Sequence, residues 1–298
     1  MRLAVLGCSR TPALEDVASG LGRSSWDVAK GLAARGHDVS YLGAYGSSVP
    51  GCEMLLFGSE HAMHSQAVGL PVDAFFDYSH SHMLSQMGDL PVLSVIGDSE
   101  TMHQPPNAVV ATEYMRTKFP KAKLVRFGID FDAIPFGEGG DRLVFMARMH
   151  HQKGWDRALE VAAIAGRDIL FIGPGGFGFG LENYAGALLG AEKWAAIGSS
   201  LAMLCPYDGD ASPRTPLEAA GCGTPTLCLA GDGTEEHVID GVTGLVCRDL
   251  EEMAARVDEI GRLARSRVVD EAKERYSMSN MLDRYEELLA AVAAGERW

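Results

Sequence analysis

Short apolar runs that end at glycine or polar residues alternate along this chain with stretches of helical periodicity. Residues 3–6 form a continuously apolar run that ends at Gly7, which is typical of a buried parallel strand. A loop with glycines and a helix over residues 24–35 follow, and residues 39–42 supply the next strand. The order of strand, loop, helix and strand predicts a βαβ unit at the start of the chain.

The first series continues with strands expected at residues 54–57, 74–78, 92–96 and 108–111. A polar, glycine-rich stretch at residues 137–141 then has the composition of a linker. The pattern therefore divides the chain into two blocks, residues 1–135 and residues 136–298.

A second series of alternating elements begins directly after this stretch. Strands are expected at residues 143–146, 169–172, 201–204 and 225–229, and helices at residues 155–165, 216–221, 251–265 and 280–293. Two such series predict an α/β protein with two Rossmann-like domains, each a parallel sheet with helices on both faces.

Length and composition agree with two ordinary globular domains. The chain has 298 residues, of which 47% are hydrophobic and 22% charged, and its formal net charge is -14. An acidic surface repels polyanions, so we expect no bulk binding of nucleic acid.

Six cysteines lie apart without CxxC spacing, which favours buried thiols over a zinc site or a disulfide framework. No apolar run approaches the length of a signal peptide or a bilayer span, so we expect a cytoplasmic protein without integral membrane association.

The residues that follow strands should carry the chemistry, because doubly wound sheets bind ligands at the carboxyl ends of their strands. After the strand at residues 143–146, Arg148 and Lys153 place two cations five residues apart on a strand-to-helix turn. Such a pair suits a diphosphate, although the spacing alone is equally compatible with solvated surface cations.

A second candidate segment is residues 210–225, where Asp210 and Glu218 are eight residues apart. Pro216 suits the first turn of a helix, and Thr215 and its neighbours leave N–H groups that an anion can occupy. A helical carboxylate is ordinarily a surface residue, but the apolar character of this helix favours a ligand-facing role for Glu218.

These segments resemble the signatures of retaining glycosyltransferases of family 4, the group 1 glycosyltransferases. Residues 148–154 look like the family's GRL-x-x-x-KG, and residues 210–225 resemble its E-x7-E segment. Residues 231–246 are similar to G-G-x-x-E-x-V-x-D-G-x-T-G-x-L-V. The resemblance is specific over residues 148–246 and only general over residues 49–107.

The resemblance implies the GT-B fold, in which two Rossmann-like domains with parallel sheets face a cleft. Residues 1–135 would form the acceptor-side domain and residues 136–298 the nucleotide-sugar-binding domain, with the last helix crossing back to pack on the first domain. It also implies a hexosyltransferase-type enzyme that moves a sugar from a nucleoside diphosphate sugar to an acceptor hydroxyl, with retention, without a metal and without any cofactor beyond this co-substrate.

The resemblance also assigns roles to individual residues. Arg148 and Lys153 would hold the donor diphosphate and stabilise the leaving nucleotide, which is the electrostatic contribution expected without a metal. Asp210 would face the donor sugar, and Glu218 would hold the ribose hydroxyls. We therefore expect catalytic roles for Arg148, Lys153 and Asp210, and a donor site formed by Gly20, Arg148, Lys153, Gly173, Tyr184, Asp210, Arg214, Thr215 and Glu218.

The chain departs from the family pattern on the sugar-facing side. Asp210 replaces the usual glutamate, and Ser212-Pro213-Arg214 replaces the usual Phe-Gly-Leu, which adds a cation and removes one N–H donor. The family often has a histidine after its fourth N-terminal strand. Here the nearest substitute is His103, a possible sugar-side residue whose alternative is an ordinary loop histidine.

Three other hypotheses stay open. Asp208-Gly209-Asp210 matches a DxD metal motif of a different glycosyltransferase fold, but it coincides with the E-x7-E position, so we expect no metal. A nucleotide-sugar epimerase or hydrolase with the same fold is one alternative function, and a degenerate, non-catalytic binding subunit is another. The acceptor is unidentified, and the absence of a basic amphipathic helix favours a soluble one.

Overall fold

The computed structural model describes all residues except 18, 98–100, 102, 178–179 and 210–212. The described residues form two compact units, Met1–Gly128 with Met278–Trp298, and Ile129–Ser277. The assignment of residues 1–135 to an acceptor-side domain and of residues 136–298 to a nucleotide-sugar-binding domain stays a prediction. Among the described residues, none of the helices combines the length and the apolar character that a membrane crossing needs.

The first unit contains a seven-stranded parallel sheet in the order β3-β2-β1-β4-β5-β6-β7. Its strands are β1 (Arg2–Leu6), β2 (Asp38–Ala44), β3 (Glu53–Phe57), β4 (Ala74–Asp77), β5 (Val92–Val95), β6 (Ala108–Val110) and β7 (Lys123–Leu124). In β1, an interior strand of the sheet, Leu3 pairs with Val39 on one side and Ala74 on the other. A strand enclosed on both faces must be apolar at every position, which explains the unbroken run at residues 3–6.

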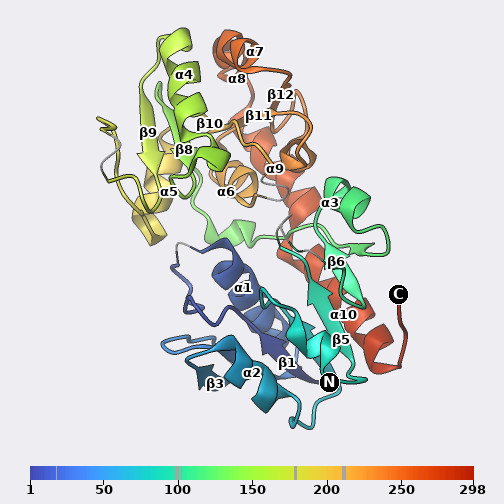
Figure 1. Cartoon of the computed structure of the whole chain (residues 1–298). Coiled ribbons are helices and arrows are strands. Elements are labelled where there is room, and N and C mark those ends of the chain that lie inside the picture. The colour runs from blue at the N-terminus through green and yellow to red at the C-terminus, as the bar shows by residue number, and fades with distance from the viewer. Residues whose placement is uncertain (18, 98–100, 102, 178–179, 210–212) are drawn as a thin grey trace. The chain divides into compact units, whose positions relative to one another are not determined.

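Helices cover both faces of this sheet. Helices α1 (Gly20–Ala34) and α10 (Met278–Ala293) pack on one face, and α2 (Glu60–Ala67) packs on the other, while α3 (Glu113–Lys118) contacts β6 and β7. Adjacent residues of β4 point to opposite faces, so Phe76 packs in the α1 and α10 layer and Phe75 in the α2 layer. Tyr285 of α10 meets the Phe76 ring edge-on at 4.7 Å. Figure 1 shows α10, in red, beside β5 in this unit.

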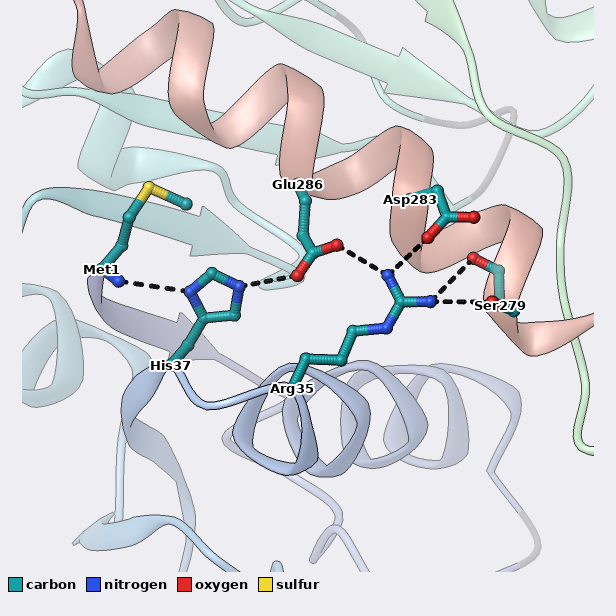
Figure 2. A network of polar contacts seen from close by, with 6 residues as sticks. All are labelled: Met1, Arg35, His37, Ser279, Asp283 and Glu286. Atoms are coloured by element: carbon teal, nitrogen blue, oxygen red, sulfur yellow. Dashed lines mark hydrogen bonds and ion pairs between the residues drawn. The ribbon is translucent and has the colours of Figure 1, made fainter.

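A polar network joins the end of α1 to α10 within the first unit (Figure 2). The Arg35 guanidinium donates to Asp283 Oδ1 at 2.7 Å, to Glu286 Oε2 at 2.6 Å, and to both the backbone and the hydroxyl oxygen of Ser279. His37 Nε2 lies 2.7 Å from the other Glu286 oxygen. The network ties residues 35–37 to residues 279–286, although these segments are far apart in the sequence.

The second unit contains a five-stranded parallel sheet in the order β12-β11-β10-β8-β9. Its strands are β8 (Leu143–Met146), β9 (Ile169–Ile172), β10 (Ala202–Cys205), β11 (Thr226–Leu229) and β12 (Gly244–Cys247). The chain passes from β8 to β9 on one side and then crosses to β10 on the other. The topological switch point therefore lies between β8 and β10, which is where open α/β sheets bind their ligands.

Six helices accompany this sheet among the described residues. They are α4 (Trp155–Ala165), α5 (Gly190–Gly198), α6 (Thr215–Gly221), α7 (Leu250–Ala255), α8 (Val257–Ile260) and α9 (Arg265–Tyr276). The single helix expected at residues 251–265 is wrong. The helical backbone is interrupted at Arg256 and becomes extended at Ala264, so that two short helices precede α9.

Residues 137–141 are not a free linker, because they pack into the second unit. Gly137 donates its N–H to Cys222 O, and a Cβ at this position would lie 2.3 Å from the Gly198 backbone. The Arg265 guanidinium also donates to Gly137 O, Gly198 O and Cys222 O, among other acceptors. Glycine is needed here for close packing of backbones rather than for chain flexibility.

Candidate functional site

Segments after β8 and β10 flank the switch point of the second sheet, and both carry residues that the sequence singled out. Arg148 is exposed and forms no hydrogen bond or ion pair with the described residues. Lys153 is half-buried and ends the 3-10 turn η3 (His151–Lys153) directly before α4. An available guanidinium and a partly desolvated ammonium on one short loop suit an anionic ligand.

Gly154 fixes the geometry of this loop. Its backbone is left-handed, with φ of 70°, and a Cβ at this position would lie only 2.3 Å from Pro206 O. A side chain is therefore excluded by backbone conformation and by space together. The Lys-Gly pair consequently brings the loop after β8 directly against the segment after β10.

Tyr207 connects three parts of the site, and it was not among the residues singled out from the sequence. Its hydroxyl lies 2.7 Å from Thr215 Oγ1 and donates to Met146 O at 3.3 Å, while Lys153 Nζ lies 5.8 Å from its ring centroid. The side chain is buried. One aromatic residue thus joins the end of β8, the start of α6 and the predicted phosphate-binding lysine. The available signal was an aromatic residue two positions after a buried strand.

Arg157 of α4 strengthens the same junction. It donates to Pro206 O at 2.7 Å and pairs with Asp208 Oδ2 at 3.5 Å, while the Asp208 N–H donates to Gln152 O. Asp208, the first carboxylate of the DxD pattern, is therefore engaged by an arginine. Among the described residues, no three His, Cys, Asp or Glu side chains are grouped as metal ligands would be. Asp210 lies outside the described residues.

Helix α6 begins where the sequence expects it. Arg214 is the N-cap residue, Thr215 begins the helix, and Pro216 occupies its first turn, where a missing N–H removes no helical hydrogen bond. Thr215 is held by Tyr207, as described above. Glu218 is half-buried and forms an ion pair with Lys193 of α5, whose Nζ lies 3.5 Å from Glu218 Oε1. Lys193 was not among the predicted residues.

The turn after β9 is built on Gly173 and Tyr184. Gly173 has φ of 141°, and a Cβ there would lie 1.8 Å from Ala147 O, so only glycine allows β9 to approach the loop that carries Arg148. The Tyr184 hydroxyl donates to Gly173 O at 2.6 Å and accepts from Gly176 N–H at 3.0 Å. Tyr184 therefore shapes the turn itself, while its ring edge meets the exposed Phe177.

The loop after β11 is also organised by a carboxylate. Glu235 accepts hydrogen bonds from the N–H groups of Gly231 and Gly233, both at 3.0 Å, and Asp232 accepts from Thr234 N–H. These bonds occupy N–H groups of the glycine-rich stretch that resembles the family's third motif. Glu235 is thus a structural partner of this loop.

Two predicted residues lie in the first unit. Gly20 is the first residue of α1, capped by Ser19, and a Cβ at this position would meet no atom within 4 Å. Contacts within the described protein therefore do not require a glycine at this position. His103 is exposed and precedes β6. The structure brings together Arg148, Lys153, Gly173, Tyr184, Arg214, Thr215 and Glu218 in the second unit, and their roles stay predictions.

Comparison with known proteins bears on this arrangement. Residues 140–262 match the family model described as "Glycosyl transferases group 1". This region resembles a group 1 glycosyltransferase domain and spans less than half of the chain. It contains all the sites described above in the second unit. No curated protein sequence matches the chain.

Solved structures resemble the whole chain. AviGT4, a glycosyltransferase involved in avilamycin A biosynthesis, is 20% identical with a TM-score of 0.81, covering 100% of this chain and 99% of its own. HepE of Anabaena, in complex with UDP and glucose, is 13% identical with a TM-score of 0.77, covering 98% and 100%. Sucrose-phosphate synthase of Thermosynechococcus elongatus is 13% identical with a TM-score of 0.77, covering 99% and 100%.

The fold is therefore an α/β fold with two parallel sheets, similar to that of GT-B glycosyltransferases, as the sequence predicts. The family match and this fold together support a glycosyltransferase.

Proposed function

We propose that the protein transfers a sugar from a nucleoside diphosphate sugar to an acceptor hydroxyl, with retention at the anomeric carbon and without a metal. The observation that carries the proposal is that the segment with Arg148 and Lys153, after β8, and the start of α6, after β10, flank the switch point of the second sheet, where Tyr207 contacts both Lys153 and Thr215. The UDP and glucose bound by HepE support a nucleotide-sugar donor.

In the proposed reaction, the bond between the anomeric carbon and the diphosphate oxygen breaks, and its electron pair stays with the diphosphate. The acceptor oxygen forms the new bond on the same face, and the acceptor proton passes to the departing diphosphate. Arg148 and Lys153 stabilise the charge that develops on the leaving group. This role needs cations that are not already neutralised, which fits the exposed Arg148.

Metal independence rests on two supports. The site supplies its own positive charge through Arg148 and Lys153, so the leaving group needs no divalent cation. Asp208 is paired with Arg157, which places the first DxD carboxylate in a structural contact. On the sugar-facing side, Asp210 and Arg214 stand where the family pattern has Glu and Leu, and we assign them to the donor sugar. We further propose that the transferred sugar is a hexose, that the acceptor is soluble, and that the reaction takes place in the cytoplasm.

A thermal-shift screen against UDP-, GDP- and ADP-sugars identifies the donor. A ligand at ~100 times its dissociation constant adds about 2.7 kcal/mol to the free energy of unfolding. With that donor, we expect Lys153→Ala to reduce turnover by roughly 100-fold or more, the scale of losing one electrostatic contact to the transition state.

Lys273→Gln is the matched control, because it removes a lysine that pairs with Asp132 within the same unit. The control should keep full turnover, and all variants should melt close to the parent. Full activity of Lys153→Ala would contradict the site. Free sugar or an epimer formed without an acceptor would indicate the hydrolase or epimerase instead. No affinity for any of these nucleotides would indicate a non-catalytic subunit.

A further inference from the structure

Lys193 of α5 and Glu218 of α6 form an ion pair beside the candidate donor site. Lys193 Nζ lies 3.5 Å from Glu218 Oε1, and each side chain is only 14% exposed. Both groups are therefore largely withdrawn from water, in contrast to the surface ion pairs of this unit, such as the one between Arg248 and Glu252. A partly buried pair is less screened by solvent and salt than an exposed one.

The lysine is itself held in place. Its ammonium lies 3.8 Å from the ring centroid of Trp194, and Trp194 packs against the core of the second unit. A cation over an indole face at this distance is attracted by the ring. Lys193 therefore presents its charge to Glu218 from a fixed position rather than from a mobile side chain.

The surroundings of Glu218 give the pair its importance. The other residues of α6 from Pro216 to Gly221 are buried, so the carboxylate stands alone on an apolar helix. The charge of Glu218 also affects the neighbouring Cys222. Burial is the main cause that raises the pKa of the Cys222 thiol to about 12, and the negative charge of Glu218 adds to it, while Lys193 and Arg265 act in the opposite direction. Lys193 is the cation that compensates Glu218 directly.

We propose that Lys193 is a positioning residue that orients Glu218 for the ribose hydroxyls, and that it thereby makes the site selective for ribonucleotide donors. The inference rests on the proposed function and on the ribose contact that the family resemblance implies for Glu218. An ionised carboxylate has about four lone-pair sites on two oxygens. The ammonium binds at Oε1, so the remaining sites accept from the sugar, and the direction of Oε2 is set by the ion pair.

The proposal predicts a selective loss. Without the ammonium, the Glu218 side chain is free to rotate, and the hydrogen bond to the ribose 2′-hydroxyl weakens. The affinity for a ligand that lacks the 2′-hydroxyl should fall less, because this ligand does not form that hydrogen bond. A purely structural role for Lys193 would instead weaken ribonucleotide and deoxyribonucleotide binding by the same factor.

The test is a calorimetric titration with UDP, GDP and ADP and with their 2′-deoxy counterparts, using the base that the unaltered protein binds most tightly. We expect the unaltered protein to favour the ribonucleotide by about tenfold or more, since a hydrogen bond to a charged group is worth at least that factor. Lys193→Met keeps most of the aliphatic stem but removes the charge, and with it the contact between the ammonium and the Trp194 ring. It should reduce the preference to about threefold or less, and Lys193→Arg should restore most of it.

Glu218→Gln and Lys273→Gln complete the set. Glu218→Gln should reduce the preference as Lys193→Met does, whereas Lys273→Gln should leave it unchanged. An unchanged preference in Lys193→Met, with a reduced one in Glu218→Gln, would overturn the role of Lys193 alone. An unchanged preference in Glu218→Gln would overturn the ribose role of Glu218 and with it this inference. No binding of any nucleotide would overturn the proposed function.

Discussion

The network around Arg35 predicts a measurable loss of stability in the first unit when its charge is removed. Arg35→Met keeps most of the aliphatic stem and deletes the hydrogen bonds to Asp283, Glu286 and Ser279. The Glu286 contact should contribute about 1 kcal/mol, because Arg35 is 25% and Glu286 29% exposed. The Asp283 contact should add only a few tenths of a kcal/mol, because this carboxylate is 62% exposed.

The two bonds to Ser279 bring the total to about 2 kcal/mol. Urea unfolding followed by circular dichroism measures the free energy, and hydrogen exchange of peptides from residues 20–34 and 278–293 localises the loss to α1 and α10. Asp132→Asn, which removes an exposed carboxylate from the second unit, is the control. A loss below about 0.5 kcal/mol, with unchanged exchange in α10, would show that the network contributes nothing beyond packing.

Two further predictions concern stability, and a third concerns nucleotide affinity measured by calorimetric titration. Burial raises the pKa of Glu286, but the hydrogen bonds from His37 and Arg35 outweigh burial and hold the pKa below its ordinary value of 4.5. The ionised carboxylate therefore stabilises the fold above pH 4.5, and this stabilisation is lost as the pH falls through the lowered pKa. Glu286→Gln should flatten the acid limb of a profile of unfolding free energy against pH. An unaltered acid limb would refute this. Gly173→Ala should cost about 3 kcal/mol in urea unfolding, because its Cβ would collide with Ala147 O at a positive φ; near-normal stability would contradict the described turn. Tyr207→Leu should lower the affinity for a nucleoside diphosphate about threefold, because the Lys153 ammonium loses the aromatic ring beside it. The same substitution should cause no further loss of affinity in a Lys153→Ala protein. Additive losses in this double-mutant cycle would mean that Tyr207 does not act through Lys153.

The parts of the structure that the sequence predicted well are those set by local physics. Residues 3–6 and 143–146 are strands because a run of apolar residues without helical spacing suits a strand covered on both faces. The turn at Lys153 and Gly154 was also predictable, since glycine before a helix signals a special backbone geometry, and φ at Gly154 is indeed positive.

The parts that sequence reasoning missed depend on long-range contacts. Lys193 lies 25 residues before Glu218, and only the packing of α5 near α6 brings the two charges together. Tyr207 was missed because nothing local in the sequence shows that its hydroxyl contacts Thr215 and Met146. The prediction of one helix over residues 251–265 was wrong because the helical spacing of apolar residues continues through Arg256, whereas the helical backbone is interrupted there.

The discontinuous first unit has a consequence for how the chain folds as it leaves the ribosome. Its sheet is encoded by the first 128 residues, but α10, which contributes six buried side chains to one face, is encoded by the last part of the sequence. Synthesis proceeds at about 5–20 residues per second, so the face that α10 covers stays bare for roughly seven to thirty seconds while residues 129–277 emerge. The second unit is one continuous segment of the chain, so it can fold before the first unit is complete. Nascent chains halted before residue 278 should therefore expose the apolar part of the sheet that α10 covers, beside α1, as a binding surface for chaperones.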